Sequence, residues 1–91
     1  MKFVVVYDIE NDKSRQKLFD LLGEYGSRVN YSVFEIQLTK SQLKRLKIEI
    51  LDLVDLKFDS VRFYYINETT QNLSFELCKR GDIFEDINLF F

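Results

Sequence analysis

The sequence contains no histidine, no tryptophan and no proline, and its one cysteine is Cys78. Without histidine there can be no Ser-His-Asp triad and no Cys-His pair, and a zinc-finger spacing is also absent. One cysteine cannot form an internal disulfide, so nothing indicates an oxidising compartment. With three glycines, long irregular loops are not expected, and there is no glycine-rich phosphate loop. Any chemistry must therefore come from carboxylates, hydroxyls and basic side chains.

What the sequence does contain is enough for one small folded domain. The chain has 91 residues, of which 46% are hydrophobic. A domain of this size hides only about 60 to 65% of its extended surface, so it would gain stability from dimerisation. The first apolar run, from Phe3 to Tyr7, is too short for a signal peptide or a membrane span. We therefore expect a cytoplasmic protein with no membrane partner.

The net charge of −2 hides an asymmetry between the two halves of the chain. Residues 1–47 carry nine basic and six acidic side chains, a net charge of +3. Residues 48–91 carry four basic and nine acidic side chains, a net charge of −5. A polyanion is therefore expected to bind the first half of the chain.

The first part of the chain predicts a strand followed by a helix. Residues 2–9 form a continuous β-branched and aromatic run, which is typical of a central strand covered on both faces. Asn11 or Asp12 is placed to cap a helix whose apolar residues recur at helical spacing. Gly26 is expected to end that helix in a left-handed conformation.

The next part predicts two short strands, a second helix and another strand. The alternation of apolar residues in 27–38 slips by one position, so a bulge or tight turn is expected near residues 32–34. Thr39 and Gln42 form a capping box ahead of the second helix, and residues 60–66 read as a strand. The order β-α-β-β-α-β predicts an α+β, ferredoxin-like domain over residues 1–66.

The C-terminal part, residues 67–91, is expected to add one strand and an aromatic tail. Residues 67–72 are polar and resemble a short linker, whereas residues 73–78 alternate as a fifth strand does. A turn over residues 79–82 leads to a phenylalanine-rich end. Such an apolar tail needs a surface to cover it. We therefore expect a homodimer in which this segment packs on the partner subunit.

Asp8 is the first candidate for chemistry. A carboxylate that closes a buried apolar strand is costly unless it meets water, hydrogen-bond donors or a cation. Mg²⁺ takes one or two carboxylates together with waters and substrate phosphate, so Asp8 suits a magnesium site. One carboxylate is too little by itself, but two copies facing each other across a dimer axis would suffice. The alternative is a strand-end aspartate that only caps the following turn, and Glu10 and Asp12 are expected to be exposed.

Basic side chains form the second candidate feature. They gather at the start of the first helix and on the following strand, where they could hold a phosphate backbone. The alternative is ordinary helix-surface charge, which is also the expected role of the basic residues on the second helix. The candidate phosphate-binding residues are Lys13, Arg15, Lys17 and Arg28.

Strand aromatics are the third feature. Tyr7, Phe34, Tyr64 and Tyr65 could stack on bases, as aromatic residues do on RNA-binding sheets. The glycine-aromatic signature of that RNA-binding module is absent, however. Packing in the core is therefore the favoured role for these four residues.

Three blocks of sequence together resemble a known family. They are VVVYDIENDKSRQKL, YGSRVNYSVFEIQLT and SVRFYYI, and they closely resemble the CRISPR-associated protein two family, the small subunit of the spacer-acquisition machinery. The likeness covers residues 1–66. Asn30 stands where the family usually has glutamine, and Glu10 where it often has serine or threonine.

The resemblance implies a fold, partners and an activity. Family members are ferredoxin-like homodimers that bridge dimers of the CRISPR integrase along captured DNA. Several are described as metal-dependent endonucleases on single-stranded RNA or double-stranded DNA. The family's metal-binding aspartate corresponds to Asp8 and its neighbouring tyrosine to Tyr7. Its basic contributors correspond to Arg15 and Arg28, and its strand phenylalanine to Phe34.

The leading hypothesis is a scaffold of CRISPR adaptation that retains a Mg²⁺-dependent phosphodiesterase site at Asp8. In this hypothesis the partners are a second copy of the chain, the integrase, and DNA or RNA. One alternative is a catalytically silent nucleic-acid-binding scaffold. Another is a toxin-like ribonuclease of the virulence-associated protein D type.

Overall fold

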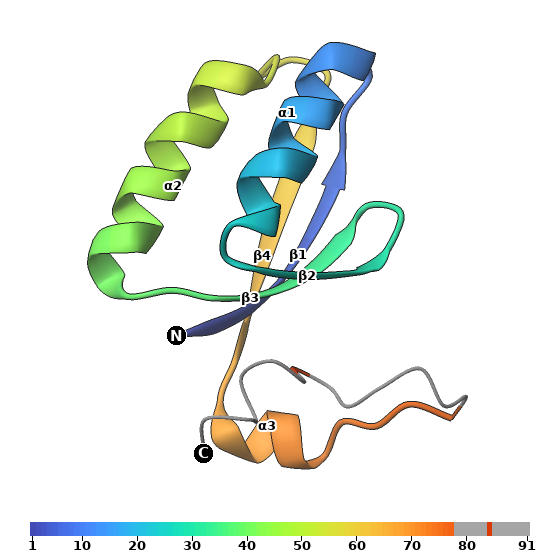
Figure 1. The fold of residues 1–91 in the computed structure, drawn as a ribbon, viewed down its shortest axis with the longest axis vertical. Coiled ribbons are helices and arrows are strands. Elements are labelled where there is room, and N and C mark those ends of the chain that lie inside the picture. Colours follow the sequence, from blue (N-terminus) through green and yellow to red (C-terminus); the bar gives the residue numbers. More distant parts are fainter. Residues whose placement is uncertain (78–83, 85–91) are drawn as a thin grey trace.

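Four strands and two long helices follow the hydrophobic pattern of the sequence. The computed structural model describes residues 1–77 and residue 84. Figure 1 shows the arrangement of these elements along the chain. The elements are β1 (Lys2–Asp8), α1 (Asp12–Gly23), β2 (Gly26–Asn30), β3 (Val33–Gln37), α2 (Lys40–Leu53), β4 (Ser60–Ile66) and α3 (Glu68–Asn72).

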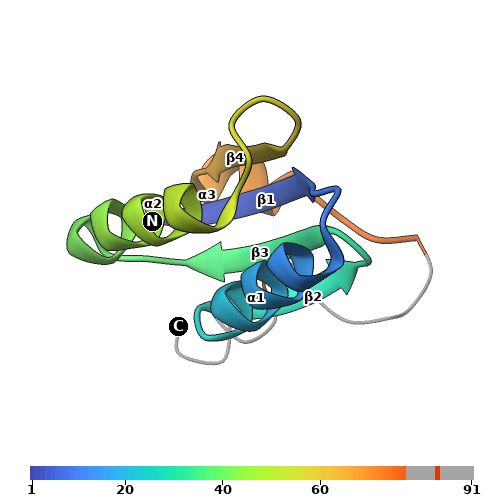
Figure 2. The ribbon, with the colours of Figure 1, turned by 90° about the horizontal axis from the view of Figure 1, so that it is seen from above.

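The strands form one antiparallel sheet in the order β2-β3-β1-β4. β1 is a central strand, in which Phe3 lies between Ile36 of β3 and Tyr65 of β4. With α1 and α2 placed between the strands along the chain, this is the α+β, ferredoxin-like fold that the sequence predicts. Figure 2 shows the same sheet and helices from above.

The core lies between one face of the sheet and the two long helices. Phe3, Val5 and Tyr7 alternate along β1 and are buried against Leu18 of α1 and Leu46 of α2. The residues between them on β1 are only half-buried. The expectation that β1 is covered on both faces is therefore wrong for the described part of the chain, because both long helices pack on the same side.

The helix starts agree with the sequence, but the end of α1 does not. Asn11 caps α1, and Thr39 with Gln42 forms the expected capping box of α2. α1 ends at Gly23, and Gly26 begins β2 instead of stopping the helix. A Cβ at Gly26 would lie 1.9 Å from the backbone oxygen of Glu35. Gly26 is therefore needed for close approach of two strands and not for a left-handed turn.

The slip in alternation does produce two short strands, as expected. The turn between β2 and β3 consists of Tyr31 and Ser32. This tight turn agrees with the prediction, and a further irregularity shifts the register between Arg28 and Asn30.

The segment after β4 differs from the expectation. Residues 68–72 form the short helix α3, capped by Asn67 and Thr70, where a linker was expected. Residues 73–77 do not form a strand, because no sheet edge within the described part of the chain pairs with them. Cys78 and the expected turn and aromatic end lie outside the described residues. Among the described helices, none is long and apolar enough to cross a membrane.

Candidate functional site

A cleft of about 500 Å³ opens beyond the end of β1. Its walls come from the end of β1, the first turns of α1 and the turn between β2 and β3. Antiparallel pairing brings that turn back beside β1, so residues far apart in the sequence meet here. The lining residues are Tyr7, Asp8, Ile9, Asp12, Arg15, Gln16, Phe19, Arg28, Tyr31 and Ser32.

Asp8 is the exposed last residue of β1. Its neighbours in the sheet differ on the two sides, because β3 pairing ends at Val6 whereas β4 pairing continues to Asp8 and Ser60. Within the described part of the chain, the Asp8 carboxylate has no side-chain hydrogen bond or ion pair. The alternative role of turn cap is therefore not seen, and the carboxylate is available to a ligand.

Arg15 is fixed in the wall of the cleft by two acceptors. One guanidinium nitrogen donates to the carbonyl oxygen of Ile9 at 2.9 Å, and another pairs with the carboxylate of Asp12. Its side chain remains 45% exposed. Arg15 therefore connects the loop after β1 to the first turn of α1, and its remaining N–H groups are available to a ligand in the cleft.

Arg28 lies between two aromatic rings. Its guanidinium carbon is 5.2 Å from the centre of the Phe19 ring and 5.8 Å from that of Tyr31. Both distances are within the range of cation–π attraction. The two rings thus hold the arginine at the cleft, and no acidic side chain among the described residues forms an ion pair with it.

The pKa of the Tyr7 hydroxyl depends on burial and on both arginines. Burial raises the pKa of its hydroxyl, and the positive charges of Arg28 and Arg15 oppose that rise. The hydroxyl donates a hydrogen bond to the carbonyl oxygen of Tyr31 at 3.3 Å. Tyr7 thus holds the β2–β3 turn against β1, next to Asp8.

The structure brings together only part of the predicted site. Asp8, Tyr7, Arg15 and Arg28 line one cleft, whereas Lys13 and Lys17 do not. Successive helix residues are turned by about 100°, so both lysines lie well away from the α1 face that lines the cleft. They remain exposed on the same helix.

The aromatic residues divide into two groups. Tyr7 and Phe34 are buried core residues, so packing is their role in this structure and neither ring is open to a base. Tyr64 and Tyr65 are 48% and 60% exposed, and the expectation that they lie in the core is wrong. On β4 they stand on an edge strand that the helices do not cover completely.

Sequence patterns missed the two residues that frame Arg28. Phe19 was one apolar residue among many on a helix, and Tyr31 was one position in an irregular strand. Glycine and asparagine are the residues preferred in two-residue hairpin turns, so a tyrosine in such a turn is unusual. This unusual residue type is the feature of the sequence that could have identified Tyr31.

The donor set of one chain is small for a metal ion. No group of three metal-ligating side chains occurs among the described residues. In the cleft, Asp12 is paired with Arg15, which leaves Asp8 as the open carboxylate. Mg²⁺ often keeps several waters and uses one or two carboxylates with substrate phosphate. The residues therefore fit an ion that is shared with a phosphate or a second copy of the chain.

Fold and cleft define a ferredoxin-like domain with an arginine-lined cleft at the end of its first strand. The family model described as CRISPR associated protein Cas2 matches residues 1–73. The chain belongs to the Cas2 family. This membership confirms the resemblance seen in the three sequence blocks.

Individual relatives agree with this assignment. A Synechocystis protein named CRISPR-associated endoribonuclease Cas2 3 is 43% identical over 68 residues, covering 75% of this chain and 74% of its own. CRISPR-associated endonuclease Cas2 2 of Thermus thermophilus is 44% identical over 62 residues, covering 68% of this chain and 69% of its own.

Solved structures show the same fold. The Cas2 crystal structure from Streptococcus pyogenes has a TM-score of 0.76 at 30% identity, covering 86% of this chain and 100% of that one. A chain in a partial Cas6-RT-Cas1–Cas2 complex has a TM-score of 0.75 at 31% identity, covering 84% of this chain and 83% of that one.

Proposed function

We propose that this chain is a subunit of CRISPR spacer acquisition whose cleft at Asp8 hydrolyses nucleic-acid phosphodiesters with a divalent cation, Mg²⁺. The observation that carries the proposal is the exposed, unpaired Asp8 carboxylate in the same cleft as Arg15 and Arg28. The relatives named endoribonuclease and endonuclease support it.

The residues of the cleft divide the work of binding. Arg15 and Arg28 are the positive groups that line it, and guanidinium N–H groups match phosphate oxygens in geometry and charge. Tyr7 keeps the β2–β3 turn in place through its hydrogen bond to Tyr31. A phosphodiester held here lies beside a carboxylate that can recruit a cation.

The proposed reaction is addition of water oxygen to phosphorus and cleavage of one P–O ester bond. The leaving oxygen takes a proton from solvent, because the sequence has no histidine to supply it. Mg²⁺, when bound, supplies positive charge at the phosphate and lowers the pKa of a water molecule. Asp8 would hold that cation or accept the proton of the attacking water.

The partners follow from the family and from the surface of the chain. One relative of known structure is part of a complex with Cas1, which supports a CRISPR integrase as partner. Leu73, Phe75 and Leu77 are 74%, 76% and 88% exposed, which supports a homodimer in which residues 67–91 pack on a second copy. DNA, and RNA in the nuclease role, are the proposed nucleic-acid ligands.

A second candidate function is a bridge without catalysis. It is favoured by the absence, among the described residues, of any cluster of three metal-ligating side chains. In that case the cleft binds nucleic acid but does not cleave it. Family membership favours both of these roles over a toxin-like ribonuclease.

A cleavage assay with two matched variants distinguishes these roles. Asp8→Asn keeps the shape of the side chain but binds Mg²⁺ weakly, so cleavage of single-stranded RNA or duplex DNA should fall at least about a hundredfold. Asp12→Asn is the control, because it removes a carboxylate that lines the same cleft but is already paired with Arg15. Equal cleavage by wild type and Asp8→Asn, or none by either, would favour the silent bridge.

A further inference from the structure

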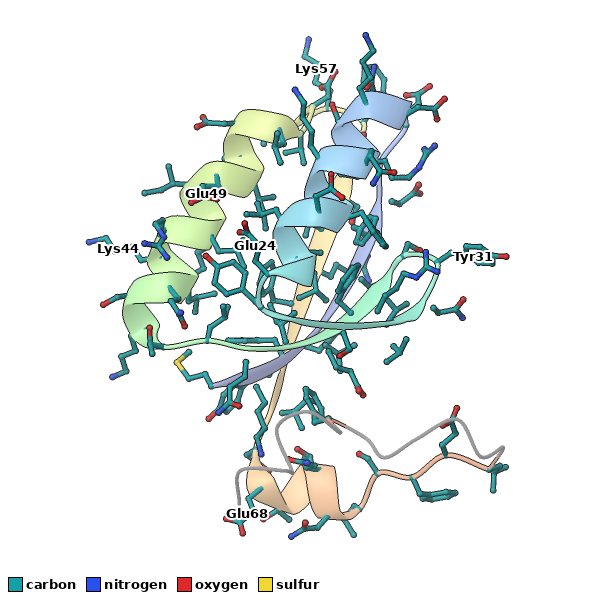
Figure 3. All side chains as sticks on the ribbon, viewed as in Figure 1. Glu24, Tyr31, Lys44, Glu49, Lys57 and Glu68 are labelled. Carbon is teal, nitrogen blue, oxygen red and sulfur yellow. The ribbon has the colours of Figure 1, made fainter. Side chains whose placement is uncertain are left out.

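Tyr31 is an aromatic residue left in water at the rim of the cleft. It belongs to the two-residue turn between β2 and β3 and is 86% exposed. Figure 3 shows its side chain pointing away from the body of the molecule at the tip of that turn. An exposed ring beside a polar cleft offers a flat apolar surface to a ligand.

The turn that carries Tyr31 is tied to β1 through its backbone. The backbone N–H of Tyr7 donates to the carbonyl oxygen of Ser32 at 3.1 Å. The Tyr7 hydroxyl donates to the carbonyl oxygen of Tyr31 at 3.3 Å, and the Tyr31 N–H donates to Asn30 Oδ1 at 2.8 Å. Because Tyr7 directly precedes Asp8, these bonds hold Tyr31 in a set position relative to the open carboxylate.

The Tyr31 ring is also the last member of a series of contacts that starts in the core. Buried Phe34 meets Phe19 edge to face, with ring centres 5.6 Å apart. Phe19 in turn lies under the guanidinium of Arg28, which lies over Tyr31. Arg28 contacts the Tyr31 ring, and the high exposure of that ring leaves further surface open to solvent. Another flat group can therefore pack on the exposed surface of the Tyr31 ring.

We propose that Tyr31 is a stacking residue for an unpaired nucleobase of the strand whose phosphate lies at Arg15, Arg28 and Asp8. Stacking needs a base that is free of its pairing partner, so this contact favours single strands over duplexes. The proposal rests on the proposed function for the position of the phosphate. What it adds is the contact between a base and the Tyr31 ring, which can form without any cleavage.

The test measures binding and not cleavage. The intact wild-type chain, Tyr31→Ala and Tyr31→Phe are titrated, with Ca²⁺ in place of Mg²⁺, against a short single strand that contains 2-aminopurine. We expect Tyr31→Ala to bind about tenfold more weakly and to lose quenching of the 2-aminopurine fluorescence, since loss of one stacked base has about this effect. Tyr31→Phe keeps the ring and should bind within about twofold of wild type.

Two controls separate stacking from other effects. A strand of the same length made of abasic residues should bind equally to wild type and Tyr31→Ala. Tyr65→Ala removes another exposed tyrosine, at the opposite end of β1 beside Phe3, and should leave binding of the normal strand unchanged. Circular dichroism and thermal unfolding confirm that each variant is folded.

Each outcome decides the proposal. It is wrong if Tyr31→Ala weakens the normal and the abasic strand equally, or if it weakens neither. Wild-type protein that binds no single strand would contradict the stacking contact, whereas the proposed function would still be tested by cleavage of duplex DNA. Strong binding that depends on Tyr31, together with cleavage that Asp8→Asn does not change, would contradict the proposed reaction alone.

Discussion

Gly26 shows how one small residue permits the sheet that carries the cleft. The position opposite it on β3 is Ile36, and the backbone oxygen of Glu35 occupies the space that a Cβ would need. Gly26→Ala should therefore lower the free energy of unfolding by about 1–3 kcal/mol, the range for overpacking. Urea unfolding at fixed protein concentration measures the effect.

Gly23 provides the matched control for this prediction. A Cβ at Gly23, the last residue of α1, meets no atom within 4 Å. Gly23→Ala should raise stability by up to about 1 kcal/mol, because alanine favours the helix. If both substitutions had the same sign, close approach of β2 and β3 would not be the reason for the glycine at position 26.

Glu35 makes stability depend on pH. Burial raises the pKa of its carboxyl and the charge of Glu76 adds to that rise, while the hydrogen bond that it accepts from the Phe84 N–H opposes it. A pKa raised by folding means that this group stabilises the protein at low pH and that the stabilisation is lost as pH rises through the folded pKa. Glu35→Gln should therefore be more stable than wild type at pH 7.

The difference between Glu35→Gln and wild type should disappear toward about pH 4, where the wild-type carboxyl is also neutral. Urea unfolding at the two pH values measures it. Glu24→Gln, at an exposed position after α1, controls for the change in net charge. A Glu35→Gln variant that is less stable at pH 7 than at pH 4, relative to wild type, would show that the Phe84 hydrogen bond outweighs burial.

Local sequence patterns were enough to predict most of the helices and strands. Apolar spacing and the caps at Asn11 and Thr39 depend on residues that are close in sequence, so both long helices and all four strands were predicted. The end of α1 was not, because Gly26 serves a contact with β3. A residue's role in a long-range contact cannot be seen in its local pattern.

Some residues of the candidate site could likewise be predicted from local sequence, and others could not. Asp8 could be predicted because a charge at the end of an apolar strand stands out locally. Arg15 and Arg28 could be predicted because basic residues gather in that part of the chain, and the resemblance implies the same two residues. Tyr31 and Phe19 could not, because only the folded sheet brings the β2–β3 turn beside α1. The capping of α3 by Asn67 and Thr70 was missed because a polar stretch was read as a linker.

The segment 73–77 tests the proposed homodimer. Its alternating apolar residues fit a strand, but this segment is exposed and pairs with neither edge strand of the described sheet, β2 or β4. Phe75→Asp should therefore dissociate the dimer, since a charge would be buried against the partner. Sedimentation at micromolar concentration measures this. Ser41→Asp, at an exposed position of α2 outside residues 67–91, should leave the dimer intact.

A monomer in the wild-type protein would contradict the proposed assembly outright. A dimer that Phe75→Asp does not disturb would place the interface elsewhere. The next surface to test would then be the face of the sheet opposite α1 and α2, where Val4 and Val6 of β1 are half-buried.

For the whole molecule, charge and fold agree on where nucleic acid would bind. Asp8, Arg15 and Arg28 all belong to the first 47 residues, which carry the net positive charge. The acidic second half includes α3, which follows β4 at the Lys2 end of the sheet, away from Asp8. The cleft thus lies at one end of the domain and the acidic segment leaves from the other.

The central claim is that Asp8 brings a divalent cation to this cleft. Among the described residues, one chain offers one open carboxylate there, so we expect a second copy or a bound phosphate to complete the coordination. Mn²⁺, which takes the same oxygen ligands, can be followed by electron paramagnetic resonance while a short single strand is present. Asp12→Asn serves as the control for loss of a nearby charge.

We expect wild-type protein to bind Mn²⁺ and Asp8→Asn to weaken this binding at least about tenfold, while Asp12→Asn should change it little. A ratio of one ion to two chains would mean that the two copies share the ion. Mn²⁺ binding that is equally strong in wild type and Asp8→Asn would contradict the account, because the cation would then be held by other residues.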